Sequence, residues 1–445
     1  MACAVPTKGE QNMKGEQRAL EAVAVAALAA LASMPASAQL SSGSVFGAMG
    51  AETPTRAASL IDSIGVNTHF DHQTPYDGPE FPAIAKLLVN SGIKHIRDGT
   101  NTQSQYIARL TYLAQSGIRT TIVTRPDLKD ALIQSYPSMI PNSMEAYEGP
   151  NEPDRGKDPS WPATIRAFMQ RLHDDVKSDA AVAHYPIVAP AVTSSHELLG
   201  DINAYVDYGN THDYFSTYNP GTRGWGNRHP AGIYGSLSYN MNLARVISGS
   251  KPIESTETGY GSTPSGTPQL LDYVTDGKYI PRLYFVQYNA GIVRTFVYEF
   301  LDPDKSGRLY RNFGLIDADL KPKPAYNAVK AVIADLADAS TSFAATPLTY
   351  EIAGDYRHVQ HTLLQKSDGS YYLALWLEVP SWKNGAPIAV GPQTVRLVTK
   401  KPMSAISVLR LGDDGNPSTS LLSHDSAHGI PLRVTDSVSI IKLVP

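Results

Sequence analysis

The stretch SMEAYEGPNEPD (143–154) decides the fold, because a strand-like run in it ends in a turn of Gly, Pro and Asn that carries an acidic residue. The stretch KPIESTETGYG (251–261) is built in the same way. A glutamate lies at the end of each run, Glu152 in the first stretch and Glu257 in the second. These stretches therefore predict two strands whose ends present acidic side chains that are far apart in the sequence.

Around these two stretches, β-prone runs alternate with segments of helical periodicity from about residue 60 to residue 335, which is typical of a parallel sheet covered by helices. FPAIAKLLVNSG (81–92) and PATIRAFMQRLHDDVKS (162–178) are two of the expected helices. Eight runs are expected to form strands, namely 63–70, 93–99, 119–126, 143–153, 185–192, 214–220, 251–259 and 292–300. We therefore predict an α/β fold with a (β/α)8 TIM barrel over residues 60–341. Glu152 and Glu257 then lie at the carboxyl ends of the fourth and seventh strands, where the active sites of such barrels lie.

The pattern changes after residue 341 to strands with a period of two, separated by turns. HTLLQKSDGSYYLALWLEV (361–379) reads as two strands joined by a Ser-Asp-Gly turn, and QTVRLVTK (393–400) and SVSIIKLV (437–444) as two more. We predict a C-terminal β-sandwich domain over 342–445, packed rigidly on the barrel. We expect its role to be structural, whereas an exposed pair of Trp376 and Trp382 on one face would indicate glycan binding.

The first residues have the pattern of an export signal. Basic residues precede the apolar stretch AVAVAALAALA (22–32), and Ala36-Ser37-Ala38 follows as a small-residue cleavage site. We predict a signal peptide over 1–38, an N-terminal segment over 39–59, and a secreted or periplasmic protein with no membrane insertion after cleavage. The alternative is a membrane anchor, but the apolar stretch is shorter than the roughly 20 residues that a spanning helix needs.

Charge and cysteine content exclude several classes of function. The net charge of −4 gives no basic footprint for nucleic acid or anionic lipid. The one cysteine, Cys3, lies inside the predicted signal, so the mature chain has no thiol for a disulfide, a metal site or a nucleophile. We expect no cofactor and a monomer.

Two acidic side chains on different strands are what cleavage of a glycosidic bond requires. One carboxylic acid protonates the leaving oxygen while one carboxylate faces the anomeric carbon. Glu148 and Glu254 are rivals for these roles. Glu148 lies deeper in its strand, and Glu254, three residues before Glu257, should point to the opposite face of its strand. The predicted pair is therefore Glu152 and Glu257.

Four motifs resemble those of retaining glycoside hydrolases of clan A, closest to family 39-like members with a TIM barrel and a β-sandwich. They are GPNEPD (149–154), TETGYG (256–261), KHIRDG (94–99) and FVYEFLDPD (296–304), the last followed by FGLIDADLKPKPAYNAVK (313–330). The resemblance covers nearly the whole chain after the predicted signal. It implies that Glu152 is the acid/base and Glu257 the nucleophile.

The same resemblance assigns substrate-binding roles. It implies that Asn151 contacts a sugar hydroxyl and that Arg97 braces the nucleophile. On the sixth strand, the clan's His-x-Tyr pair is matched only by Tyr218 in YFSTYNP (214–220), and on the eighth strand Tyr298 stands where a tryptophan is usual. Position alone adds His69, at the end of the first strand, and Trp225, in the loop after the sixth, as residues that could contact a sugar. The alternative for His69 is a hydrogen-bonded residue that caps the strand end, and for Trp225 a packing residue.

Metal binding is not expected. His69 and His72 have a spacing that would not aim both side chains one way on a strand. The segment 302–307 resembles the start of a calcium loop, but the twelfth position is Phe313 in place of a glutamate.

The predicted function is therefore hydrolysis of a β-linked poly- or oligosaccharide by double displacement, with a carbohydrate as the partner. The two carboxyl groups should lie about 5–5.5 Å apart, whereas an inverting enzyme would hold them about 6.5–9.5 Å apart. The pKa of Glu152 should be raised by the charge of Glu257 and by burial. A catalytically silent carbohydrate-binding protein and a transglycosylase on the same scaffold are the alternatives.

Overall fold

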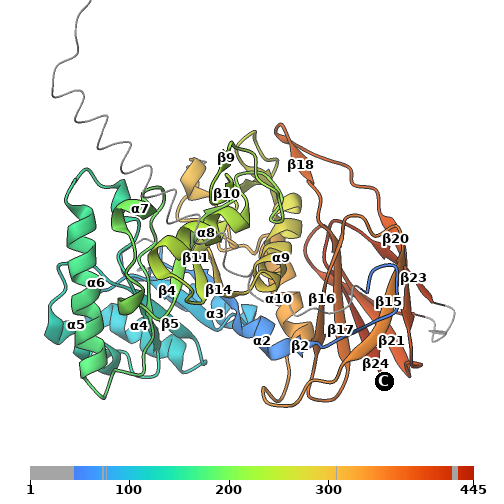
Figure 1. The fold of residues 1–445 in the computed structure, drawn as a ribbon, viewed down its shortest axis with the longest axis horizontal. Coiled ribbons are helices and arrows are strands. Elements are labelled where there is room, and N and C mark those ends of the chain that lie inside the picture. The colour runs from blue at the N-terminus through green and yellow to red at the C-terminus, as the bar shows by residue number, and fades with distance from the viewer. Residues whose placement is uncertain (1–44, 73–74, 77, 307, 423–428) are drawn as a thin grey trace, which may run out of the picture.

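Eight parallel strands form one sheet in the order β7, β6, β5, β4, β3, β14, β11 and β8, and a parallel bridge between Val188 and Tyr208 joins its two edges. The sheet is therefore a barrel, as predicted (Figure 1). Its strands are β3 (Ile64–Asn67), β4 (His95–Asp98), β5 (Arg119–Val123), β6 (Met144–Glu148), β7 (Ile187–Val188), β8 (Gly209–Tyr214), β11 (Ile253–Gly259) and β14 (Ile292–Val297). This computed structural model describes residues 45–72, 75–76, 78–306, 308–422 and 429–445, so the predicted signal peptide lies outside the described residues.

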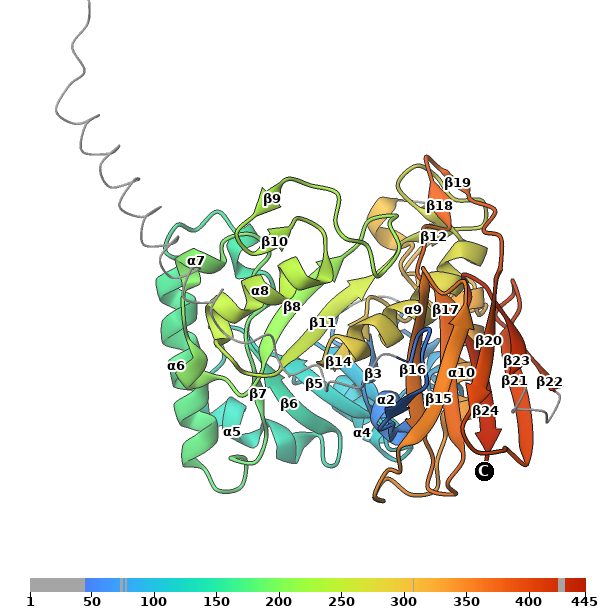
Figure 2. The same cartoon turned by 45° about the vertical axis from the view of Figure 1, so that its right-hand side comes forward.

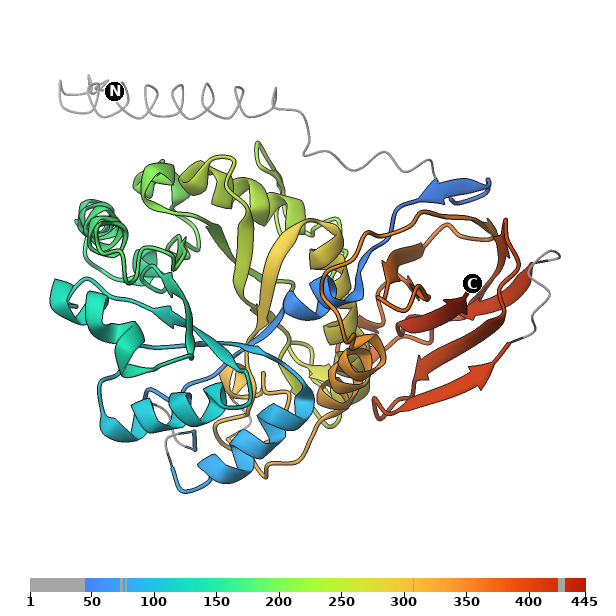
Figure 3. The same cartoon turned by 90° about the horizontal axis from the view of Figure 1, so that it is seen from below.

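Helices surround the barrel (Figure 3). α3 shows why they form: Ile84, Ala85 and Leu88 share one buried face, and Gly92 ends the helix with φ 81°, which a glycine adopts without a steric penalty. In the described part of the chain none of the helices is both long and apolar enough to span a membrane. The helices are α2 (Ala57–Asp62), α3 (Phe81–Ser91), α4 (Ser104–Ala114), α5 (Asp130–Met139), α6 (Trp161–Ser178), α7 (His196–Leu199), α8 (Leu237–Ser248), α9 (Tyr273–Asn289) and α10 (Pro324–Leu336), with 3-10 turns η1 (Pro153–Arg155), η2 (Asn203–Tyr205) and η3 (Leu309–Arg311).

The sixth strand differs from the prediction. It is β8 (Gly209–Tyr214), with the sequence GNTHDY, and the predicted run 214–220 lies in the loop beyond it. The prediction placed the strand too late because β8 is polar: side chains such as Asn210 and His212 point into the interior of the barrel, where they bond to residues of other strands. The loop after β8 holds the ribbon β9 (Arg228–His229) and β10 (Gly232–Ile233).

Two sheets, antiparallel except for the pairing of strand β2 (Thr55–Arg56), form the C-terminal sandwich beside the barrel, which confirms the predicted architecture (Figure 2). The segment before the barrel also contributes to it, since β1 (Gly50–Glu52) pairs with β15 and β2 with β16. The other strands of the sandwich are β15 (Leu348–Gly354), β20 (Gln393–Thr399) and β23 (Ile430–Val434) in one sheet, and β16 (Val359–Gln365), β17 (Tyr371–Leu377), β24 (Ser439–Val444), β21 (Ala405–Leu411) and β22 (Pro417–Leu421) in the other. Two further pairs of short strands lie outside the barrel sheet and the sandwich sheets. They are β12 (Ser262–Thr263) with β13 (Leu271–Asp272), and β18 (Trp382–Lys383) with β19 (Ala386–Pro387).

An apolar interface joins the sandwich to helices α2, α9 and α10. At its edge Glu378 accepts hydrogen bonds from Arg282 of α9 and from Asn219 in the loop after β8, at 2.6 Å each. Trp376 and Trp382 are both buried, so they do not form the exposed aromatic pair that would indicate glycan binding. The interface instead ties the sandwich to a loop beside the mouth of the barrel.

Candidate active site

The carboxyl ends of the barrel strands surround a cleft with a volume of about 1280 Å³. Glu257 lies near the end of β11, and Glu152 lies four residues beyond the end of β6. Glu152 has φ 40°, a left-handed conformation that is unusual for a residue with a Cβ and is found at functional turns. Both glutamates line the cleft. One carboxylate oxygen of Glu152 lies within 4.8 Å of one of Glu257.

Arg97, at the third position of β4, holds the floor of the cleft together. Its Nη1 donates to Glu257 Oε1 at 2.7 Å, and its Nε and Nη2 donate to the two oxygens of Glu148 at 2.6 and 2.8 Å. Nη2 also donates to Asn151 Oδ1 at 2.8 Å. Glu148 is fully buried and absent from the cleft lining, so it serves as a second anion for the guanidinium. This bidentate pair of hydrogen bonds between Arg97 and Glu148 fixes the guanidinium group that also contacts Glu257.

Tyr214 and His212, both on β8, connect to the two glutamates. Tyr214 Oη donates to Glu257 Oε2 at 2.9 Å. His212 Nδ1 lies 2.9 Å from Glu152 Oε1 and 3.6 Å from Glu257 Oε2, while its Nε2 lies 3.2 Å from Thr256 Oγ1. These two residues form the His-x-Tyr pair that the prediction missed by placing the sixth strand five residues too late. The signal was present in the sequence as THDY (211–214).

The surroundings of Glu257 lower its pKa, which keeps the carboxylate ionised. Burial raises its pKa, but the charges of His212 and Arg97 and the hydrogen bond from Tyr214 outweigh burial, and the net shift is downward.

The predicted upward shift of the Glu152 pKa is wrong. Burial does raise its pKa, but the hydrogen bond and charge of His212, followed by those of Arg155, lower it to about 2. Arg155 Nη1 donates to Glu152 Oε2 at 2.7 Å. The prediction counted Glu257 as the dominant neighbour and did not include these two partners. In this structure Glu152 is therefore an ionised, paired carboxylate.

The predicted sugar-contacting residues divide into two groups. Asn151, His69, Trp225 and Tyr298 line the cleft, and the ring of His69 meets that of Tyr298 edge to face at 5.5 Å. Tyr218 does not line it. This residue is 42% exposed and stacks on Trp225, with ring centroids 4.6 Å apart, so the structure does not place this predicted substrate-binding residue in the cleft. The tyrosine that contacts Glu257 is Tyr214 of β8.

Glu254 is excluded from the cleft for a reason other than the one predicted. A register shift between Ser255 and Glu257 changes the strand's alternation, so Glu254 pairs in register with Asn210 and Glu257 with His212. Glu254 therefore also points into the barrel, but at its opposite end, where its Oε1 lies 3.7 Å from Arg294. Burial raises the pKa of Glu254 to about 7.

No family model and no curated protein matches the chain in sequence. In structure, it is similar to a family 39 glycoside hydrolase from the gut symbiont Bacteroides cellulosilyticus WH2, with a TM-score of 0.60 and 14% identity over 88% of this chain and 81% of the other. It is also similar to CelM2, a bifunctional glucanase-xylanase from a metagenome library, with a TM-score of 0.55 and 10% identity over 88% of this chain and 97% of the other. At these identities the likeness shows the fold, a barrel with an attached sandwich that glycoside hydrolases also have.

Proposed function

We propose that this protein is a retaining glycoside hydrolase that cleaves β-linked poly- or oligosaccharides, with Glu257 as nucleophile and Glu152 as acid/base. The observation that carries the proposal is the approach of Glu152 and Glu257 oxygens to within 4.8 Å across one cleft. Oxygens this close favour the roughly 5–5.5 Å separation of retaining enzymes over the roughly 6.5–9.5 Å at which inverting enzymes place a water between their carboxylates.

In the first step Glu257 attacks the anomeric carbon, the glycosidic C–O bond breaks, and Glu152 gives its proton to the leaving oxygen. In the second step Glu152 takes a proton from water, the water oxygen bonds to the anomeric carbon, and the bond to Glu257 breaks. The hydrogen bonds from Arg97 and Tyr214 hold the two Glu257 oxygens in place and stabilise the carboxylate as it leaves in the second step.

Glu152 must gain a proton before the first step. Arg155 is exposed and can turn away from Glu152, whereas a sugar that fills the cleft removes water from the carboxylate. Both changes raise the pKa of Glu152. Once the glycosyl-enzyme has formed, the negative charge of Glu257 is gone and Glu152 is favoured as the carboxylate that activates water.

A substrate screen tests this function. Aryl β-glycosides and plant and bacterial polysaccharides should be incubated with the wild type, with Glu257→Ala and with a control, Glu197→Gln, which changes an exposed glutamate on α7. We expect turnover by the wild type and the control only. Full turnover by Glu257→Ala on the best substrate would refute the nucleophile. Binding of a glycan without cleavage by any of the three would favour the silent carbohydrate-binding alternative, and products longer than the substrate would favour transglycosylation.

We further propose that the protein is exported, with cleavage after Ala38, and acts as a secreted or periplasmic monomer. N-terminal sequencing of the exported protein should begin at Gln39. An intact N-terminus on the exported protein would contradict the predicted cleavage site.

A further inference from the structure

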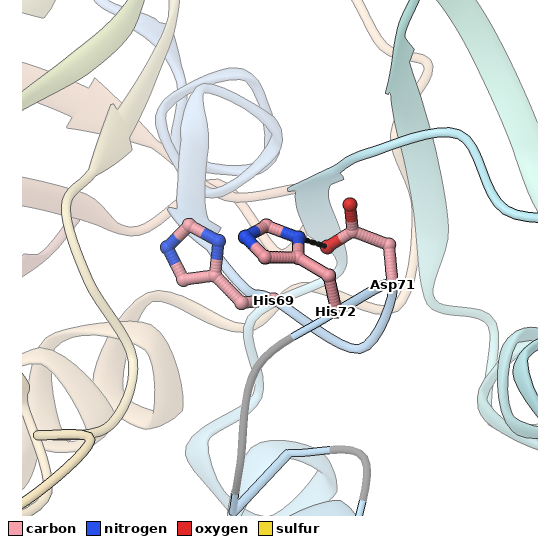
Figure 4. Close-up of side chains that lie close together, drawn as sticks. All are labelled: His69, Asp71 and His72. Carbon is pink, nitrogen blue, oxygen red and sulfur yellow. Dashed lines mark ion pairs between the residues drawn. The ribbon is translucent and has the colours of Figure 1, made fainter.

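The loop that follows β3 brings three metal-ligating side chains together at the rim of the cleft: His69, Asp71 and His72 (Figure 4). One nitrogen or oxygen from each lies within 4.8 Å of the others. The two imidazole rings meet edge to face with centroids 5.5 Å apart. The sequence argument against a metal site assumed strand geometry, but β3 ends at Asn67, so strand alternation does not govern this loop.

His72 has a carboxylate against one ring nitrogen, since Asp71 Oδ1 lies 2.6 Å from its Nδ1. Nε2 of His69 is buried without a hydrogen-bond partner among the described residues, and the nearest acidic oxygen, Glu299 Oε2, lies 3.5 Å away. The other nitrogens, Nδ1 of His69 and Nε2 of His72, face each other in Figure 4. Metal-bound histidines in proteins often have the arrangement found at His72, because a carboxylate on the outer nitrogen fixes the tautomer and makes the inner nitrogen a better ligand.

We propose that His69 and His72 bind a divalent transition-metal ion between their facing nitrogens, with Asp71 orienting the ring of His72. Imidazole nitrogens suit Zn²⁺, Ni²⁺ and Cu²⁺, whereas Ca²⁺ and Mg²⁺ prefer oxygen ligands. His69, Asp71 and His72 all line the cleft, so water or a hydroxyl group of a bound molecule can complete the coordination. The site is separate from the carboxylates of Glu152 and Glu257, and the proposal does not depend on the proposed hydrolysis.

Isothermal titration of the untagged full chain with ZnCl₂ and, separately, with CaCl₂ tests the site. We expect one equivalent of Zn²⁺ and no saturable binding of Ca²⁺. His72→Gln, a change at an exposed position, should abolish Zn²⁺ binding or weaken it at least about tenfold, and Asp71→Asn should weaken it by about 10- to 100-fold. The matched control is His173→Gln on α6, where a histidine and Asp174 form a similar pair at 3.2 Å, and it should bind as the wild type does.

Two results would overturn the proposal. One is a wild-type chain that takes up no Zn²⁺ in a saturable way. The other is unchanged Zn²⁺ binding by His72→Gln, which would place the ion elsewhere, for example among Glu152, His212 and Glu257, whose ligand atoms also lie within 4.8 Å of one another. Glu257→Ala distinguishes that case, because it should keep its Zn²⁺ if the ion binds to the two histidines.

Discussion

Replacing Arg155 with glutamine should raise the pKa of Glu152 and move the alkaline limb of the kcat/KM profile to higher pH. Arg155 donates to Glu152 Oε2 at 2.7 Å, and with His212 it holds the pKa of Glu152 at about 2. A cation stabilises the ionised carboxylate, so its removal favours the protonated form that the proposed first step needs. The limb on which activity falls as Glu152 loses its proton therefore moves upward.

The size of the shift of the alkaline limb follows from how exposed the Arg155–Glu152 ion pair is. The Arg155 side chain is 67% exposed and that of Glu152 is 14% exposed, which places the contact between an exposed ion pair of about 0.2–1 kcal/mol and a charged hydrogen bond of about 1.5–3 kcal/mol. An interaction of about 1 kcal/mol corresponds to about 0.7 pH unit.

The assay is kcat/KM measured against pH for the wild type, Arg155→Gln and Arg155→Lys, since this ratio reports the free enzyme in which the ion pair exists. The lysine variant keeps the positive charge, so its limb should stay close to that of the wild type. If the glutamine variant folds normally and its limb stays in place or moves downward, the proposed control of Glu152 by Arg155 is refuted.

Three further outcomes follow from the same contacts. Tyr214→Phe removes a hydrogen bond of about 1.5–3 kcal/mol to the Glu257 carboxylate and should lower kcat by about 10- to 100-fold, whereas Tyr218→Phe, outside the cleft, should leave kcat within about twofold; equal effects would contradict the assignment. Arg97→Met leaves the buried carboxylate of Glu148 and the partly buried carboxylate of Glu257 without their cation. It should lower the free energy of unfolding by about 3–5 kcal/mol, measured by denaturant titration; an unchanged midpoint would show that the charges are compensated elsewhere. Glu378→Gln weakens the tie between the sandwich and the loop after β8, and should raise KM and lower the thermal midpoint; a normal KM would show that the loop is fixed by other contacts.

The barrel and the sandwich could be predicted because most of their strands carry β-branched or aliphatic runs bounded by turn residues. β8 could not be placed in this way. Its sequence GNTHDY is polar, since its interior side chains bond to the carboxylates of Glu148 and Glu152 and do not pack in an apolar core. The contribution of β1 and β2 to the sandwich was also hidden, because strands of three and two residues give no periodic signal.

Within the site, Glu152 and Glu257 could be located because each lies at or just beyond the end of a recognisable strand. Their environments were harder to predict. Arg155 is three residues from Glu152, and the short 3-10 turn η1 brings the two side chains together, so a local signal existed. His212 is 60 positions away and reaches Glu152 only through the closure of the barrel. The pKa of Glu152 depends on both partners, which is why composition and strand order alone gave the wrong direction.

The anomeric form of the first product tests the central claim most directly. If Glu257 attacks one face of the sugar and water later attacks from that same face with the help of Glu152, a β-linked substrate must give a β product. Proton NMR recorded in the first minutes of hydrolysis, on the best substrate from the screen, should show the β anomer first, with the α anomer forming later by mutarotation. Initial release of the α anomer would contradict double displacement by these two carboxylates.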